Sequence, residues 1–381
     1  MSNQFTVLQI ASTYKPAWTY GGPVISTSRL CEALVKTQTD LELLTTSANG
    51  KKELEVPLGK RLNIDGVLTT YYRRWIGYNI HFTPGLLCAF LQKHKRFKVI
   101  HIHEWWNSVA VLTVVLCKCV GRKPVLTPRG MLSPYTLRSP LKRLFQRWVG
   151  AWLLRGTILH ATSEQEAAEA LELVPGWSHF ILPNIIELPA LGQYPPAQKA
   201  SEVFRLVFLS RVHPKKGLEN LLAALAQLDF PWHLQVVGTG EATYLAQLQA
   251  EARALGIAQQ IEWLGWREGA EKFQLLANAD LYVLPSQNEN FANAALEALS
   301  VGTPVLLSAQ VGLSAYVRTQ ALGWIYDGTT AGLLQALQSA YTAAGQRTEI
   351  RQKAPSLVLA DFGAERIAQQ YLAAYQNFGL L

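Results

Sequence analysis

The 381-residue chain is poor in charge and in cysteine, and it has no long apolar run. Charged residues make up 16% and hydrophobic residues 49%. This balance excludes a disordered chain, which needs low hydrophobicity and high net charge. The longest apolar run, 109–117, is far shorter than the ~20 residues that a membrane span needs. The N-terminus also lacks the basic segment of a signal peptide, so we expect a cytoplasmic protein.

The cysteines point to structural thiols in a reducing compartment. Their spacing does not suggest a disulfide framework. Two of them form a C-x-C pair, but no second cysteine or histidine cluster completes a zinc site. The four positions are Cys31, Cys88, Cys117 and Cys119.

Positive charge is in excess only in the first half of the chain. The whole sequence has 35 Lys and Arg against 27 Asp and Glu, a net charge of +8. Residues 1–185 hold 22 basic and 11 acidic residues, a net +11, which leaves −3 for residues 186–381. A basic surplus predicts an anionic partner: nucleic acid, a membrane surface or a phosphorylated substrate.

Short β-branched runs alternate with helical patterns, which predicts parallel sheets covered on both faces. A proline-rich stretch at 183–201 reads as a linker between two α/β halves. Ligands of such sheets bind at the carboxyl ends of the strands. Strands are expected at 5–10, 41–46, 99–103, 125–127, 157–161, 204–210, 232–237, 261–264, 281–284 and 304–308. Helices are expected at 23–36, 164–173, 218–228, 244–255 and 333–343.

One candidate loop of the first half follows the first expected strand. Gly21 and Gly22 precede Pro23, and proline suits the first turn of a helix. Glycine lets backbone N–H groups approach an anion at a helix N-terminus. An ordinary turn is the alternative.

Two further loops of the first half carry polar side chains. His103 ends the strand 99–103, just before a glutamate and two tryptophans. Arg129 stands between proline and glycine after the strand 125–127, where it could contact an anion or a sugar. The alternatives are a core histidine and a surface arginine.

In the second half, Arg211 ends a strand and Lys216 precedes a helix. Two cations five residues apart near a helix N-terminus would suit a diphosphate, whereas a solvated charge run is the alternative. The Gly238–Gly240 pair lacks the third glycine and the later acidic residue of a dinucleotide site. It reads better as a tight turn.

Glu289 and Glu297 form the sharpest pattern. Glu289 lies in a loop after the strand 281–284, and Glu297 lies eight residues later in an expected helix. Eight helical residues rise about 12 Å, whereas the carboxylates of a glycosidase stand about 5 to 9.5 Å apart. The two carboxylates are therefore interpreted as separate anchors, one for a sugar and one for a ribose.

Together these loops resemble the family-4 retaining glycosyltransferases of GT-B fold. The resemblance rests on Glu289-x₇-Glu297, Arg211…Lys216 and Gly21-Gly22, and it runs nearly end to end. The segment 128–132, PRGML, resembles the bacterial exopolysaccharide and capsule branch. The resemblance implies two Rossmann-like, doubly wound parallel-sheet domains that face a cleft. The acceptor-side domain would comprise 1–185 with a crossing helix at 362–381, and the donor-binding domain 200–361.

The resemblance also implies roles. Glu289 would bind the hydroxyls of the donor sugar and Glu297 the ribose, while Arg211 and Lys216 would neutralise the diphosphate. His103, Arg129 and Glu289 would form the catalytic centre. Backbone groups would complete the donor site at Gly21, Gly22, Asn290, Phe291, Ala292 and Asn293.

Two positions depart from the family. Ala292 stands where many members have glycine. Arg129 stands where many have histidine, and an arginine cannot act as a general base because its pKa is above ~12.

The predicted function is transfer of a hexose, with retention, from a nucleotide-diphosphate sugar such as UDP-glucose to a glycan or lipid-diphosphate-linked acceptor. No D-x-D motif follows an expected strand, so we expect no metal and no other cofactor. The rival interpretations are a GT-B epimerase, a phosphorylase and a non-catalytic sugar-nucleotide-binding protein. Nucleic acid is not expected as a partner, because no recognised binding motif accompanies the charge.

The segment 138–155 is both basic and amphipathic. Leucine, phenylalanine and tryptophan recur near helical spacing with four basic residues between them. An ordinary core-facing helix is one interpretation. The other is contact with an anionic membrane surface, which would place the protein at the inner face of the plasma membrane.

Overall fold

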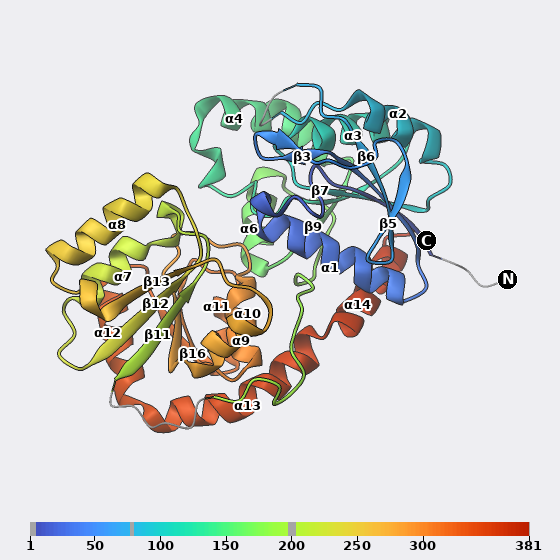
Figure 1. Ribbon diagram of the computed structural model, residues 1–381. Coiled ribbons are helices and arrows are strands. Elements are labelled where there is room, and N and C mark those ends of the chain that lie inside the picture. The colour runs from blue at the N-terminus through green and yellow to red at the C-terminus, as the bar shows by residue number, and fades with distance from the viewer. Residues whose placement is uncertain (1–4, 77–79, 197–202, 381) are drawn as a thin grey trace. The chain divides into compact units, whose positions relative to one another are not determined.

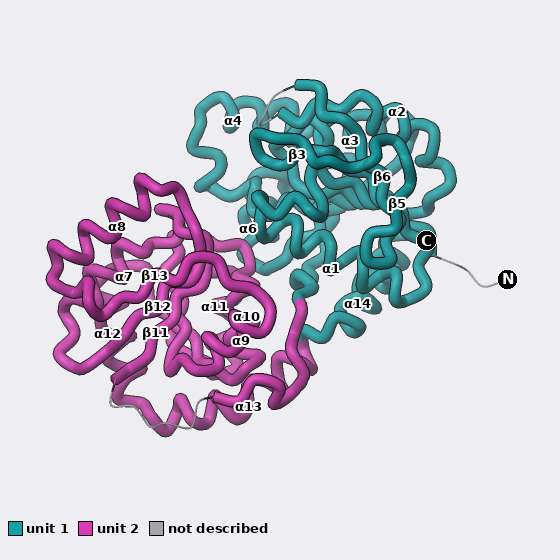
Figure 2. The backbone as a smooth tube through the Cα atoms, viewed as in Figure 1, with its two compact units in different colours: residues 1–186, 362–381 teal, residues 187–361 magenta. Residues whose placement is uncertain are grey.

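A computed structural model describes residues 5–76, 80–196 and 203–380. The chain divides into two compact units (Figures 1 and 2). Unit 1 comprises residues 1–186 and 362–381, and unit 2 comprises residues 187–361. The division falls within the stretch 183–201 that we interpreted as a linker, although the last part of that stretch lies outside the described residues.

Unit 1 is built on an eight-stranded sheet. The strand order is β10-β9-β8-β7-β1-β2-β6-β5, and neighbouring strands are parallel except β5 and β6. Reversals of strand order about β1 and β7 make this a doubly wound sheet. The bounds are β1 Thr6–Ile10, β2 Asp40–Thr46, β5 Arg61–Ile64, β6 Val67–Tyr72, β7 Val99–His103, β8 Val125–Thr127, β9 Ile158–Ala161 and β10 His179–Ile181. A separate two-stranded ribbon pairs β3 Ala48–Asn49 with β4 Lys52–Glu53.

Helices cover both faces of this sheet, and each face has its own hydrophobic core. The last helix, α14, packs against α1 over one face. The other core forms beneath α2, α3, α5 and α6. The bounds are α1 Gly22–Lys36, α2 Pro84–Lys93, α3 Ser108–Cys119, α4 Pro140–Phe145, α5 Ala151–Leu154, α6 Glu164–Leu173 and α14 Ala364–Asn377.

Unit 2 is built on a six-stranded parallel sheet of order β13-β12-β11-β14-β15-β16. Figure 1 shows α7, α8 and α12 on one side of this sheet and α9, α10 and α11 on the other. The strands are β11 Phe204–Leu209, β12 Trp232–Val237, β13 Ile261–Gly265, β14 Leu281–Leu284, β15 Val305–Ser308 and β16 Gly323–Tyr326. The helices are α7 Leu218–Leu225, α8 Ala242–Ala254, α9 Gly269–Asn278, α10 Asn293–Ser300, α11 Ser314–Thr319, α12 Thr330–Thr342 and α13 Ala344–Phe362.

The predicted fold class is confirmed, and all ten predicted strands are present with ends that differ by at most one residue. The central strands are buried along their length because helices cover both faces. Besides the β3–β4 ribbon, the pattern missed four strands that lie at a sheet edge or, for β6, beside one. They are short or partly exposed and therefore lack a continuous apolar run. These are β5, β6, β10 and β16.

Candidate functional site

The loops after β11 and β14 bring Lys216 and Glu289 together in unit 2. These strands are neighbours, so their carboxyl ends lie at one edge of the sheet. Lys216 ends a 3₁₀ turn, Pro214–Lys216, and its Nζ forms an ion pair with Glu289 Oε2. The two side chains are only 12% and 22% exposed. The pair is therefore partly shielded from water, which strengthens the attraction between its charges.

The two loops are also joined through the backbone. The amide of Gln287 donates to the carbonyl of Lys215 at 2.9 Å. Gly217 has φ +68°, and a Cβ on it would lie 2.3 Å from the carbonyl oxygen of Pro285. Only glycine permits this approach, so Gly217 allows the loop after β11 to contact the start of the loop that carries Glu289.

Arg211 contributes a second cation at the same edge. It is exposed and follows β11. Burial lowers the pKa of His213, and the charges of Arg211 and Lys216 lower it further. The positive charges of Arg211 and Lys216 therefore both reach His213, which lies between them in the sequence, and they would attract an anion to this loop.

The glycine pair after β12 closes the adjacent loop. A Cβ on Gly238 would lie 1.8 Å from the carbonyl oxygen of Ser210, and one on Gly240 would lie 2.1 Å from that of Val212. The pair thus allows the loops after β11 and β12 to touch, which agrees with our interpretation as a tight turn.

The segment before α10 adopts the backbone that the family's glycine would favour. Ala292 has φ +74° and ψ +65°, and it precedes Asn293, the first residue of α10. This left-handed conformation costs a non-glycine residue roughly 1–2 kcal/mol. The alanine therefore changes the strain of this turn but not its conformation. Asn290 and Phe291 lie directly before it, in the same turn.

Glu297 lies in α10 and takes part in a different ion pair. Lys272 of α9 forms an ion pair with it at 2.8 Å, and both side chains are about one-fifth exposed or less. The sequence reasoning missed Lys272, because nothing in the sequence indicates that α9 packs beside α10. Burial raises the pKa of Tyr282 in β14, and the charges of Glu289 and Glu297 raise it further.

In unit 1, Arg129 lies at the centre of a polar network. It follows β8 with φ +54°. Its guanidinium donates to Ser26 Oγ at 2.6 Å, Asn184 Oδ1 at 3.1 Å and Thr27 Oγ1 at 3.1 Å. These partners come from α1 and from the segment after β10, so Arg129 holds three elements together.

His103 is buried, and both of its ring nitrogens have partners. Arg129 Nη2 lies 3.2 Å from Nδ1, and Gln9 Oε1 lies 2.6 Å from Nε2. A guanidinium only donates, so Nδ1 is the acceptor and Nε2 carries the proton. Burial holds the pKa of His103 well below its ordinary value, and the nearby His101 and Arg129 lower it further. The neutral imidazole therefore orients Arg129.

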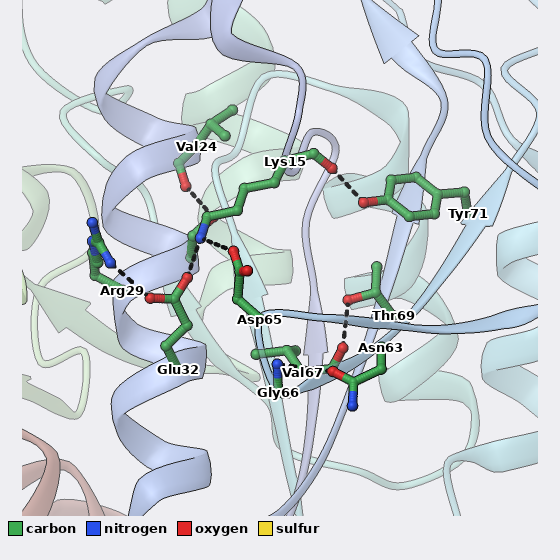
Figure 3. Close-up of polar contacts among 11 residues, drawn as sticks. Lys15, Val24, Arg29, Glu32, Asn63, Asp65, Gly66, Val67, Thr69 and Tyr71 are labelled. Carbon is green, nitrogen blue, oxygen red and sulfur yellow. Dashed lines mark hydrogen bonds and ion pairs between the residues drawn. The ribbon is translucent and has the colours of Figure 1, made fainter. Parts of the chain in front are cut away.

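Lys15 lies in the loop between β1 and Gly21, and Figure 3 shows its contacts with Glu32, Asp65 and Tyr71. Lys15 Nζ forms ion pairs with Glu32 of α1 and, at 2.6 Å, with Asp65. Its carbonyl accepts a hydrogen bond from the Tyr71 hydroxyl. Gly21 has φ +64° and Gly22 begins α1, as the pattern with Pro23 predicts.

Only part of the segment Arg138–Arg155 faces the core: Leu153 and Leu154 are buried in it, and Phe145 packs against it. The segment consists of α4, a π-helical turn and α5, and its buried residues include Gln146, which accepts from Trp105 Nε1 at 3.0 Å. Four of its apolar residues, for which we left a core face and a membrane contact open, are exposed. They are Leu141 (79%), Leu144 (58%), Trp148 (69%) and Trp152 (58%).

The predicted site residues thus fall into two sets. Gly21, Gly22, His103 and Arg129 belong to unit 1, and all the others belong to unit 2. Within the described residues, no group of three or more His, Cys, Asp and Glu side chains could hold a metal ion. No helix there combines the length and apolarity that a membrane crossing requires.

Two protein-family models match the chain, one to each half. Residues 21–184 match the Glycosyl transferase 4-like domain, and residues 195–356 match Glycosyl transferases group 1. The D-inositol 3-phosphate glycosyltransferase of Jonesia denitrificans is 26% identical over 406 aligned positions, which cover 92% of this chain and 88% of that protein.

Solved structures share the fold over nearly the whole chain. Sucrose-phosphate synthase from Thermosynechococcus elongatus superposes with a TM-score of 0.77 at 19% identity, covering 98% of this chain and 99% of that one. Anabaena HepE, solved in complex with UDP and glucose, gives a TM-score of 0.76 at 18% identity, covering 98% of this chain and all of that one.

Proposed function

We propose that this chain, which belongs to the glycosyltransferases of GT-B fold, transfers a hexose from a UDP-sugar to a hydroxyl group with retention of configuration. The observation that carries the proposal is the Lys216–Glu289 pair at the carboxyl edge of the unit 2 sheet. A diphosphate is stabilised by a cation, and the hydroxyl groups of a sugar donate hydrogen bonds to a carboxylate. This pair offers an ammonium and a carboxylate side by side. HepE, which shares the fold, was solved with UDP and glucose.

The donor diphosphate would bind between Arg211 and Lys216. Charge-assisted hydrogen bonds from these cations would stabilise the negative charge that develops as the UDP leaves. Glu289 holds the Lys216 ammonium in place before the donor arrives, and a carboxylate can also accept a hydrogen bond from a sugar hydroxyl. On this account the cations do the work that a metal ion does in other transferases, and no metal or other cofactor is required.

Glu297 would bind the ribose. A carboxylate accepts hydrogen bonds from two adjacent hydroxyls, and Lys272 fixes its orientation through the ion pair at 2.8 Å. The turn from Asn290 to Asn293 leads into α10, whose N-terminus favours negative charge. Retention without a separate nucleophile pair follows from the family resemblance.

Unit 1 would bind the acceptor. Arg129 supplies a fixed positive charge, and His103 positions it without taking part in proton transfer, because both ring nitrogens are engaged. This assignment moves His103 from the catalytic centre that we predicted to a supporting place. Gly21 and Gly22 would let the backbone before α1 approach the substrate.

We propose that the acceptor is linked to a lipid of an anionic membrane and that the reaction belongs to surface polysaccharide biosynthesis. From residue 105 to residue 163 the chain has nine Lys and Arg and no Asp or Glu. In the same region the segment Arg138–Arg155 exposes two tryptophans and two leucines. Exposed tryptophan with basic residues is the combination that binds an anionic lipid interface.

Nucleotide release from a panel of nucleotide sugars tests the donor site. We expect UDP release from a UDP-hexose, and a loss of at least a hundredfold in Lys216→Ala and Glu289→Ala. Lys353→Ala is the matched control, because Lys353 forms an ion pair with the exposed Glu349 in the same unit. Normal turnover in folded Lys216→Ala and Glu289→Ala proteins would refute the donor site.

Vesicle flotation tests the membrane contact separately. We expect binding to vesicles that contain phosphatidylglycerol, and weaker binding after Trp148→Ala or Arg147→Glu. Trp266→Ala is the control, since Trp266 is 49% exposed but lies in unit 2. Equal flotation of all four proteins, or none with any vesicle, would argue against the membrane assignment.

A further inference from the structure

Glu104 is a buried carboxylate at the carboxyl end of β7, directly after His103. It is 8% exposed. One oxygen, Oε2, accepts hydrogen bonds from Ser12 Oγ and, at 3.1 Å, from Asn107 Nδ2. Ser12 follows β1 and Asn107 precedes α3, so the carboxylate lies where two neighbouring strands end.

This carboxylate has no ion-pair partner among the described residues, and no hydrogen bond there reaches its other oxygen, Oε1. A buried carboxylate without a cation costs several kcal/mol unless its surroundings compensate. Burial raises the pKa of Glu104, while Ser12 and the charge of Arg129 act in the opposite direction. Packing alone does not account for a carboxylate at this position.

The backbone adds a second cost. Glu104 has φ +69°, and Arg129 at the end of the adjacent strand β8 has φ +54°. Non-glycine residues in this region are strained, and such residues cluster at ligand-binding sites. The Glu104 amide donates to the carbonyl of Thr127 at 2.8 Å, which ties the two strained strand ends to each other.

The hydrogen bonds of Oε2 fix the side chain and leave Oε1 to a ligand. Asn107 caps α3: its Oδ1 accepts a hydrogen bond from the amide of Ala110 at 2.9 Å. This bond fixes the side chain so that its Nδ2 points at Glu104. The side chain of Glu104 is thus oriented by Asn107, which is itself fixed by the end of α3. A carboxylate oxygen so placed accepts hydrogen bonds and is suited to a hydroxyl group.

We propose that Glu104 binds a hydroxyl group of the sugar acceptor through Oε1. The inference rests on the proposed function and names a binding residue for its second substrate. Ser12 and Asn107 are positioning residues, because they act on the acceptor only through the carboxylate.

Glu104→Gln is the sharpest test. The amide oxygen of glutamine can still accept from Ser12 and Asn107, while the free acceptor oxygen is replaced by an NH₂ group. The assay uses UDP-glucose as donor and octyl glycosides of glucose, galactose and mannose as acceptor probes, and UDP binding is measured in parallel by calorimetry. Loss of a charge-assisted hydrogen bond should raise the acceptor KM about ten- to a hundredfold. UDP affinity and the melting temperature should stay unchanged.

Glu164→Gln is the matched control, since Glu164 is an exposed glutamate of unit 1, and it should behave like wild type. If Glu104→Gln does not fold, Glu104→Asp carries the same test. Aspartate keeps the negative charge, but its shorter side chain moves the carboxylate oxygen away from the acceptor hydroxyl. An unchanged acceptor KM overturns the proposal, as does an equal fall in UDP affinity and acceptor use. A wild-type chain that binds no UDP and uses no glycoside overturns the proposed function and this inference with it.

Discussion

Replacing Gly217 by alanine should disrupt the donor site by displacing the backbone between its two loops. The residue has φ +68°, which costs alanine about 1–2 kcal/mol. Its Cβ would also lie 2.3 Å from the Pro285 carbonyl oxygen, and backbone must move to relieve that overlap. Overpacking of this kind costs a further 1–3 kcal/mol or so. We therefore expect a fall of roughly 2–5 kcal/mol in the free energy of unfolding.

The same displacement should separate Lys216 from Glu289, so UDP affinity should fall more than tenfold. Urea denaturation and UDP calorimetry measure the two effects. Gly256→Ala is the matched control: it has φ +74° after α8, but no atom lies within 4 Å of the added Cβ. The free energy of unfolding of Gly256→Ala should fall only by the cost of the left-handed backbone, about 1–2 kcal/mol, and its UDP affinity should not change. Wild-type UDP affinity in Gly217→Ala would refute the reasoning.

Three further predictions test other parts of the account. Lys272→Met should weaken UDP binding about tenfold by freeing Glu297, and an unchanged calorimetric affinity would exclude that role. Ala321→Gly should raise the free energy of unfolding by roughly 0.5–1 kcal/mol, because Ala321 is exposed with φ +51°; a lower urea midpoint would contradict this. Burial lowers the pKa of His81 to about 4, so the unfolded chain binds the proton first as the pH falls. Stability should decline between about pH 6.5 and pH 4, by up to about 3 kcal/mol from this residue. Urea midpoints of His81→Phe across that range should fall less steeply than those of wild type, and parallel curves would contradict the assignment.

The sequence was sufficient to predict the fold class and the loops that meet in unit 2. Central parallel strands are buried on both faces, so a run such as 281–284 is apolar throughout and its loop can be located. Arg211, Lys216 and Glu289 followed from that placement. Edge strands such as β5 and β16 are partly exposed and carry a weaker pattern, which is why they were missed.

Partners between elements were beyond the reach of periodicity. Lys272 lies 25 positions from Glu297, and only the packing of α9 on α10 brings the two together. The engagement of both nitrogens of His103 likewise depends on Gln9 and Arg129, which come from two other loops and strands. The exposure of the segment 138–155 could not be predicted either. Its sequence shows an apolar helical stripe, but periodicity does not reveal whether that stripe faces the core or the solvent.

The central claim is retaining transfer of a hexose from a UDP-sugar by the Lys216–Glu289 site. Proton NMR of the reaction with UDP-α-glucose and an octyl glycoside measures it most directly. The account predicts release of UDP and a new anomeric proton with the small coupling constant of an α-linkage, absent in Glu289→Ala. A β-linked product, or an α-linked product formed equally well by Glu289→Ala, would contradict it.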